Sequence, residues 1–300
     1  MRPIFWANRP KSYIMRTQSW DEFPNGRWGD SGSAAFGDLG DYHLFAVDNK
    51  KGSADELRGI WGEAPTTPDD IHAVFAAYCA NRIDRLPWME DDTLAPETAS
   101  IQRELIWLNQ NGILTINSQP RVNGLPSSDP VAGWGPADGY VYQKAYLEFF
   151  CAPAVLEAME SRLAGHPALQ YMAVNAAGES RGNAEHVCAV TWGVFPGREI
   201  QQPTVVDPES FMVWKTEAFD LWLKKWAPLY EQGTPSRALV EDIYNSYFLV
   251  NIVDNDFIGG DIYAIFAEMF EVSLADVGSN VMTPNAIQTE VPAPPIAATS

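Results

Sequence analysis

The stretch from Gly112 to Phe150 constrains the fold of this 300-residue chain more than any other part of the sequence. Two runs of strand-like residues flank a connection of about 20 residues rich in Gly, Pro, Ser and Asp, far longer than most connections in compact domains. The first run alternates two sets of side chains, so one face of the predicted strand carries polar groups: Ile113, Thr115 and Asn117 against Leu114, Ile116 and Ser118. Because long ordered loops are usually functional, this segment predicts a strand beside a binding site.

Composition limits the classes of partner. Nearly half of the residues are apolar and eleven are Trp, which is enough to build a sizeable core. A formal net charge of -19 argues against nucleic-acid or anionic-membrane partners, because the summed field repels both. The sequence therefore favours a soluble, globular cytosolic protein.

Cysteine usage and the apolar runs predict the compartment. Cys79, Cys151 and Cys188 are odd in number and stand in apolar surroundings, which is typical of reduced, buried thiols. No apolar run reaches the roughly 18 residues of a membrane span, and the N-terminus lacks the signal-peptide pattern. We expect a cytoplasmic protein.

Capping and turn signals divide the chain into helices and strands. Thr67 followed by Pro68 predicts one helix start and Pro96 another, with Gly112 placed to end the second helix. Further helices are expected after Ser53, from Asp207, after Ser236 and after Gly260, and another is expected between residues 150 and 169 with Val155, Met159 and Leu163 on its apolar face. Strands are expected at residues 42–47, 113–118, 140–150, 169–174, 187–195 and 247–253.

Irregular interspersion of these elements predicts an α+β fold, with central β-sheets flanked by helices in a single domain. No internal repeat and no Pro- or Gly-rich linker splits the middle of the chain. Residues 1–16 are interpreted as the end of an interdomain linker, 17–276 as the domain and 277–300 as a disordered tail.

No recognisable catalytic constellation is present in the sequence. Neither a GxGxxG turn nor a P-loop occurs, and the four histidines lack partners at metal-ligand spacing, so no metal site is expected. His186 and Cys188 would share a strand face without a third orienting group, which favours packing over nucleophilic chemistry. Asp254, Asn255 and Asp256 are explained by a turn at a strand end. The absence of an acid–base pair favours a binding module.

Hydroxyl and carboxylate side chains near element ends are the candidates for binding a small molecule. They are Glu97 and Thr98 in a helix first turn, Thr115 and Ser118 on the following strand, Thr191 at the end of a buried strand and Thr204 before the long helix. Each also has a plain explanation, since Thr is common in strands and Glu suits a helix start.

Several long strings join these candidates. In chain order they are RPKSYIMRTQSWDEFPNGRWGDS at residues 9–31, LAPETAS at 94–100, GILTINSQP at 112–120, GLPSSDPVAGWGP at 124–136, QKAYLEFF at 143–150, AVTWGVFPGREIQQPTVVDP at 189–208 and NSYFLVNIVDNDF at 245–257. In this order they resemble the C-terminal regulatory domain of eukaryotic methylenetetrahydrofolate reductase over almost the whole chain. The resemblance is specific because the strings are long and unusual.

This resemblance implies an allosteric sensor rather than an enzyme. The family's regulatory domain binds S-adenosylmethionine, which inhibits the enzyme, or the competing S-adenosylhomocysteine. It controls a separate catalytic barrel of the same polypeptide, which uses FAD and NAD(P)H to reduce 5,10-methylenetetrahydrofolate to 5-methyltetrahydrofolate. That barrel is not part of this sequence. The resemblance also implies a homodimer, and no catalytic residue or resident cofactor in this chain.

The resemblance implies effector contacts residue by residue. They fall on Ala95, Pro96, Glu97, Thr98, Thr115, Ser118, Thr191 and Thr204, with Ala7 of FWANRP as a further contact near the linker. Glu97 could accept a hydrogen bond from the ligand ammonium or ribose, while first-turn amides could receive its carboxylate. The sequence leaves open which group binds where.

Two alternatives remain from the residues alone. The chain could be mainly a dimerisation module with a degenerate ligand site, in which case exposed aromatic side chains would line an interface. A stand-alone methyltransferase would consume the ligand, but the missing Gly-rich turn disfavours it.

Overall fold

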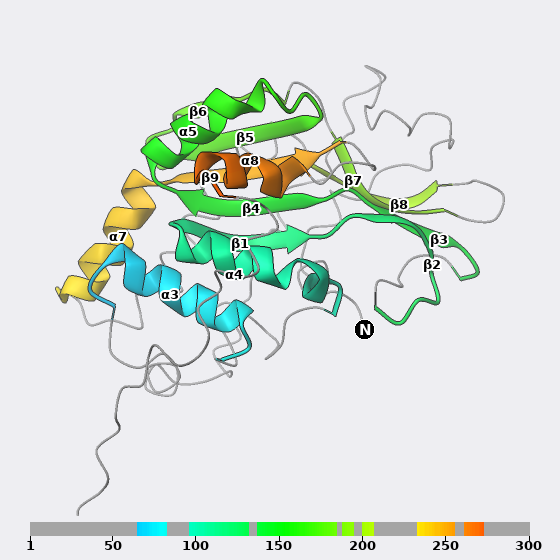
Figure 1. Ribbon diagram of the computed structural model, residues 1–300, viewed down its shortest axis with the longest axis horizontal. Helices are drawn as coiled ribbons and strands as arrows, with labels where there is room; N and C mark the ends of the chain where they lie inside the picture. Colours follow the sequence, from blue (N-terminus) through cyan, green and yellow to red (C-terminus); the bar gives the residue numbers. More distant parts are fainter. Residues whose placement is uncertain are drawn as a thin grey trace, which may run out of the picture.

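The computed structural model describes residues 65–82, 96–131, 137–184, 188–194, 200–206, 233–255 and 261–272. Figure 1 shows how their helices and strands are arranged. The predicted strand at 42–47 and the helices predicted after Ser53 and from Asp207 fall outside these ranges. Both predicted domain boundaries do so as well, and all of these stay predictions.

Helices and antiparallel strands in the described ranges confirm the α+β prediction. The helices are α3 (Pro68–Cys79), η4 (Pro96–Ile101), α4 (Gln102–Gln110), α5 (Pro153–Leu163), α7 (Pro235–Ser246) and α8 (Asp261–Met269). The strands are β1 (Ile113–Gln119), β2 (Val122–Pro126), β3 (Tyr140–Gln143), β4 (Tyr146–Cys151), β5 (Leu169–Asn175), β6 (Ser180–Gly182), β7 (Cys188–Val194), β8 (Ile200–Val206) and β9 (Phe248–Asp254). No helix in the described ranges is long and apolar enough to cross a bilayer.

The strands form two sheets. Five strands pair in the order β1-β4-β9-β5-β6, and four pair in the order β2-β3-β7-β8. Every pairing is antiparallel. In Figure 1 the four-stranded sheet extends from one end of the five-stranded sheet, so the two sheets meet where β1 leads into β2 and β3 into β4.

Helices α4, α5 and α8 lie on one face of the five-stranded sheet. Thr115 of β1 pairs with Phe149 of β4, so the two side chains share a face. Thr115 contacts Asn109 of α4, and the Phe149 ring meets Phe266 of α8 edge-on, with centroids 5.6 Å apart. Helix α5 packs against α8 and α3 against α4, which continues this layer of helices. The main core includes side chains on both faces of this sheet, with Phe149 on the helix-covered face and Leu114 and Phe150 on the other.

Helix boundaries follow the capping signals. The Thr67 hydroxyl accepts from the Asp70 amide while the Asp70 carboxylate accepts from the Thr67 amide, which completes a capping box at the start of α3. Gly112 has φ of +81°, a conformation that glycine adopts at low cost, and it ends the helical segment as predicted. The helix expected from Pro96 is instead split, because the backbone at Ile101 leaves helical geometry between η4 and α4.

The predicted strand at residues 140–150 is wrong as a single element. The structure divides it into β3 and β4, which belong to different sheets. At the break, the Lys144 amide still donates to the Val190 carbonyl of β7, whereas the Ala145 carbonyl already accepts from the Asp254 amide of β9. The chain therefore changes pairing partner within two residues without turning back, which the hydrophobic pattern does not reveal.

The long loop predicted after residue 120 is also shorter than expected. Strand β2 occupies Val122–Pro126 and forms a hairpin with β3. Strands β6 and β8 were likewise not predicted, because β6 has only three residues and β8 contains Pro203. Pro203 is tolerated because β8 is an edge strand of its sheet.

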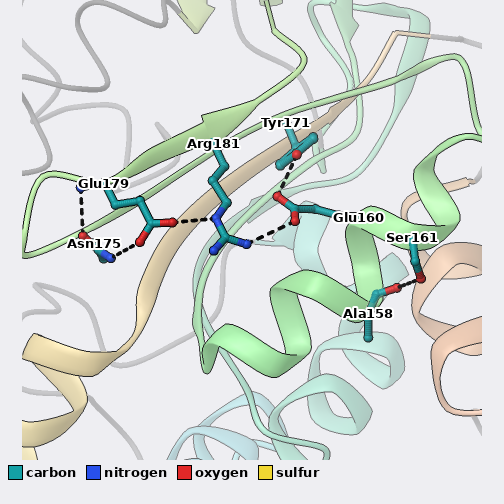
Figure 2. Close-up of polar contacts among 7 residues, drawn as sticks. All are labelled: Ala158, Glu160, Ser161, Tyr171, Asn175, Glu179 and Arg181. Carbon is teal, nitrogen blue, oxygen red and sulfur yellow. Dashed lines mark hydrogen bonds and ion pairs between the residues drawn. The ribbon is translucent and has the colours of Figure 1, made fainter.

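A polar network holds β6 in place (Figure 2). Arg181 of β6 donates to Glu179 at 2.8 Å and to Glu160 of α5 at 3.3 Å, and its guanidinium lies 5.1 Å from the centre of the Phe248 ring. The Tyr171 hydroxyl of β5 donates to the same Glu160 at 2.8 Å. One arginine thus connects a short edge strand to a helix and to the central strand β9.

Candidate functional site

The first group of predicted site residues lies on η4, where the helical segment begins. Glu97 and Thr98 are both buried, and η4 contacts β1. The Ser100 hydroxyl donates to the Glu97 carbonyl at 2.9 Å and tightens this turn. Pro96 is the first residue of η4, while Ala95 and Ala7 lie outside the described residues.

Glu97 carries the main charge of this group. Burial raises the pKa of its carboxyl group above the ordinary value. A hydrogen bond from the backbone of Glu97 itself offsets part of this rise in pKa, and no cationic side chain among the described residues pairs with the carboxylate. A buried carboxylate of this kind is stabilised by a cationic group or a hydrogen-bond donor that approaches it.

A β-bulge in β1 places two predicted residues on one face of the sheet. Strict alternation would put Thr115 and Ser118 on opposite faces, but the register shifts between Thr115 and Asn117. Thr115 pairs with Phe149 and Ser118 with Leu147, and these two β4 residues share a face. The bulge therefore brings both hydroxyl residues to the helix-covered side, which corrects the alternation expected from the sequence.

Asn109 of α4 fixes the position of Thr115. Its Nδ2 donates to the Thr115 hydroxyl at 2.7 Å and to the Leu105 carbonyl at 2.8 Å, and its Oδ1 accepts from the Thr115 amide at 3.1 Å. Cys79 lies beside this group, and burial raises the pKa of its thiol to about 12, so it is an inert neighbour. Thr115 thus has a structural partner within the protein.

The second group lies on the four-stranded sheet. Thr191 is buried in the middle of β7, rather than at the strand end as predicted, and it pairs with Thr204 of β8. The Thr191 hydroxyl donates to the Gln119 side chain at 2.8 Å. Gln119 follows Ser118 directly on β1, but consecutive strand residues point to opposite faces, so the structure shows no side-chain contact between the two groups.

Gln119 and Asn109 are residues that the sequence reasoning missed. Both are amides with almost no exposed surface, at 1% and 0%. An amide inside a helix or at the end of a strand is a weak signal, because its role depends on which backbone groups the fold brings beside it. Buried amides with all hydrogen bonds made are a common way to fix neighbouring hydroxyls.

Metal ligands are not gathered anywhere in the described residues, where no group of three His, Cys, Asp or Glu side chains could hold an ion. His166 lies 3.2 Å from Glu268, while His72 is buried on α3 in a different part of the domain. The site is therefore a set of hydroxyls, amides and one carboxylate, suited to hydrogen bonding with a small polar molecule.

Comparison with known proteins supplies the family. A family model described as "MTHFR, SAM-binding regulatory domain" matches residues 1–273. The probable methylenetetrahydrofolate reductase (NADH) of Oryza sativa subsp. japonica is 50% identical over 271 residues, which are 90% of this chain and 45% of the relative. Methylenetetrahydrofolate reductase (NADH) 1 of Arabidopsis thaliana is 50% identical over 269 residues, 89% of this chain and 45% of the relative.

A relative with lower sequence identity has the same enzyme name. The probable methylenetetrahydrofolate reductase (NADPH) of Caenorhabditis elegans is 43% identical over 272 residues, 86% of this chain and 41% of the relative. The chain spans less than half the length of these three relatives. The family predicted from the long sequence strings is thereby confirmed, and the chain belongs to the S-adenosylmethionine-binding regulatory domains of methylenetetrahydrofolate reductases.

Proposed function

We propose that this domain binds S-adenosylmethionine or S-adenosylhomocysteine at the junction of its two sheets and acts as an allosteric switch. S-adenosylmethionine binding inhibits a catalytic barrel in the remaining part of the polypeptide. That barrel uses FAD and a nicotinamide donor to reduce 5,10-methylenetetrahydrofolate to 5-methyltetrahydrofolate. Inhibition follows if the effector binds the inactive state more tightly than the active one.

The observation that carries this proposal is the buried carboxylate of Glu97 beside β1, which has no cationic partner among the residues that the structure describes. The effector contains an ammonium group, and its methylated form adds a sulfonium cation. Either cation would stabilise the ionised carboxylate that burial disfavours. Thr98, Ser118, Thr191 and Thr204 supply hydroxyls for the neutral parts of the ligand, with Ala95, Pro96, Thr115 and Ala7 as the remaining proposed contacts.

Calorimetric titration of the chain with each effector tests the proposal. We expect saturable heat and a rise in the melting temperature, because a ligand that binds the folded state stabilises it. Replacing Glu97 by Gln should weaken binding by about 1.5 to 3 kcal/mol, the range for a charge-assisted hydrogen bond. Glu157→Gln, an exposed change on α5, is the matched control. Absence of heat and of any thermal shift with both effectors would contradict the proposal.

The pH dependence of affinity gives a second test. The cation prefers the ionised form of Glu97, so binding lowers the pKa of the carboxyl group and releases a proton. Because the unliganded pKa is raised, affinity should fall as the pH drops through that raised value, and Glu97→Gln should abolish this dependence. The same slope with both effectors identifies the ammonium as the partner, and a slope with S-adenosylmethionine alone identifies the sulfonium. A wild-type affinity that is flat down to pH 4.5 would rule out the contact.

Dimerisation is a second candidate function, and exposed apolar side chains favour it. Leu125, Val131 and Tyr140 are exposed on or beside the β2–β3 hairpin, to 37%, 52% and 46%. Exposed apolar groups that gather on one element often belong to an interface. Light scattering should then report a homodimer that Tyr140→Ser weakens, and a monomer at high concentration would remove this function. Such a role is compatible with effector binding.

A further inference from the structure

Gln119 lies where the two sheets meet, and both its amide nitrogen and its amide oxygen form hydrogen bonds. Nε2 donates to the Lys144 carbonyl at 2.7 Å and to the Val190 carbonyl at 2.9 Å. Oε1 lies 2.8 Å from the Thr191 hydroxyl oxygen. The side chain thus connects β1 to the β3–β4 crossing and to β7.

These three contacts determine the orientation of the amide. Both carbonyl oxygens can only accept, so the two Nε2 hydrogens must point at them. The flipped amide would face each carbonyl with an oxygen and would lose both hydrogen bonds. Oε1 can only accept, so the hydrogen bond with Thr191 has one possible direction, in which the threonine donates its single hydroxyl hydrogen.

We propose that Gln119 is a positioning residue that makes Thr191 a pure hydrogen-bond acceptor towards the effector. This rests on the proposed function. With its hydrogen committed to Gln119, the Thr191 oxygen offers lone pairs alone. It therefore receives a donor group of the ligand, namely the ammonium, a ribose hydroxyl or the adenine amine. It cannot bind the ligand carboxylate or an unprotonated adenine ring nitrogen.

Thr115 has the opposite character for the same kind of reason. The Asn109 Oδ1 accepts from the Thr115 amide, which can only donate, so Nδ2 must be the atom that faces the Thr115 hydroxyl. Thr115 accepts that bond, and the sulfur of the neighbouring Cys79 is an acceptor for its own hydrogen. The two buried amides therefore bond to the two threonines in opposite directions: Asn109 donates to Thr115, whereas Gln119 accepts from Thr191.

A double-mutant cycle on S-adenosylhomocysteine affinity tests whether Gln119 acts through Thr191. Gln119→Met keeps the shape and removes the amide, and Thr191→Val removes the hydroxyl. We expect Gln119→Met to weaken binding about 5- to 10-fold in the wild-type background, the effect of one neutral hydrogen bond. In the Thr191→Val background it should have almost no further effect. Equal losses in both backgrounds would show general structural damage and overturn the proposal.

Two controls accompany the cycle. Asn183→Ala removes another bridging amide, which donates to Leu169 and accepts from Tyr171 at the far edge of the sheet, and should leave affinity unchanged. The melting temperature of each unliganded variant separates stability loss from affinity loss. Wild-type protein that binds neither effector would refute the proposed function itself, whereas wild-type binding with parallel losses refutes this inference alone.

Effector analogues test the polarity without any change at Gln119, so the result holds even if Gln119→Met does not fold. Wild-type protein should discriminate against one analogue of S-adenosylhomocysteine that lacks a single donor group, and Thr191→Val should lose that discrimination. Discrimination against the decarboxylated analogue should be the same in both proteins. If Thr191→Val instead removes the preference for the carboxylate, Thr191 donates to the ligand and the proposed polarity is wrong.

Discussion

At the scale of single residues, buried amides organise the candidate site more than the hydroxyls that first indicate it. Asn109 and Gln119 each satisfy several partners at once, and each determines what a neighbouring threonine can offer. A buried amide stabilises the fold only when all of its hydrogen bonds are made, because each buried partner left without a hydrogen bond costs free energy.

Asn109→Ala should lower the free energy of unfolding by about 2 to 3 kcal/mol. The change leaves the buried Thr115 amide and hydroxyl without their partner on α4. Urea denaturation measures the loss, and Gln110→Ala, an exposed change on the same helix, should stay within about 0.5 kcal/mol of wild type. A loss as small as that of the control would mean that water replaces the amide at no cost.

The sequence indicated the site residues in two ways, first by residue type and position and then by resemblance to a family. Residue type and position isolated Glu97, Thr98 and Thr115 as hydroxyl or carboxylate groups near element ends, and the resemblance joined them into one site. Neither route identified Gln119, because its partners Lys144 and Val190 lie 25 and 71 residues away in the chain. Which distant carbonyls meet at a point is a property of tertiary packing, which local patterns do not encode.

At the scale of elements, helix starts and ends were predictable and short strands were not. A capping box and a left-handed glycine act within a few residues, so Thr67 and Gly112 are readable directly. Strand β6 has three residues, two of them largely exposed, and gives no periodic signal. It forms because its backbone pairs with β5 and its Arg181 forms an ion pair with Glu160 of α5.

Gly182 in β6 is expected to tolerate no side chain. A Cβ atom there would lie 2.5 Å from the Tyr171 carbonyl oxygen and 3.2 Å from the Met172 Cα, and both of these are backbone atoms of β5. Gly182→Ala should therefore cost about 1 to 3 kcal/mol, the usual range for overpacking, and speed amide hydrogen exchange in β6. Ser180→Ala, at an exposed position of the same strand, is the control. Unchanged exchange in the alanine variant would show that β6 can move away without loss.

At the scale of the whole molecule, strands of one sheet lead directly into strands of the other, β1 into β2 and β3 into β4. The α+β class followed from the irregular order of elements, but the division into two sheets did not, because a continuous apolar run looks the same whether or not its pairing partner changes. Lys144 marks the position where the pairing partner changes. It is buried there, and its ammonium donates to the Asn255 side chain at 2.8 Å.

We expect the sheets to unfold together in one transition. Gln119 and the paired connections at the junction tie each sheet to the other, so loss of one removes contacts of the other. Differential scanning calorimetry should give a calorimetric enthalpy equal to the van 't Hoff enthalpy. Two separated transitions, or a van 't Hoff enthalpy well below the calorimetric one, would show that the sheets are independent units.

The β1 bulge and the crossings beside it restrict how the length of this chain can change. Side chains alternate with a period of two, so one residue inserted or deleted between Thr115 and Val122, or at Lys144–Ala145, would exchange the inner and outer faces of every position up to the next turn. The outer end of the β2–β3 hairpin has no such restriction, because Ser127 and Ser128 already form a turn there. Insertions and deletions among homologues should therefore collect at the hairpin tip and avoid the junction.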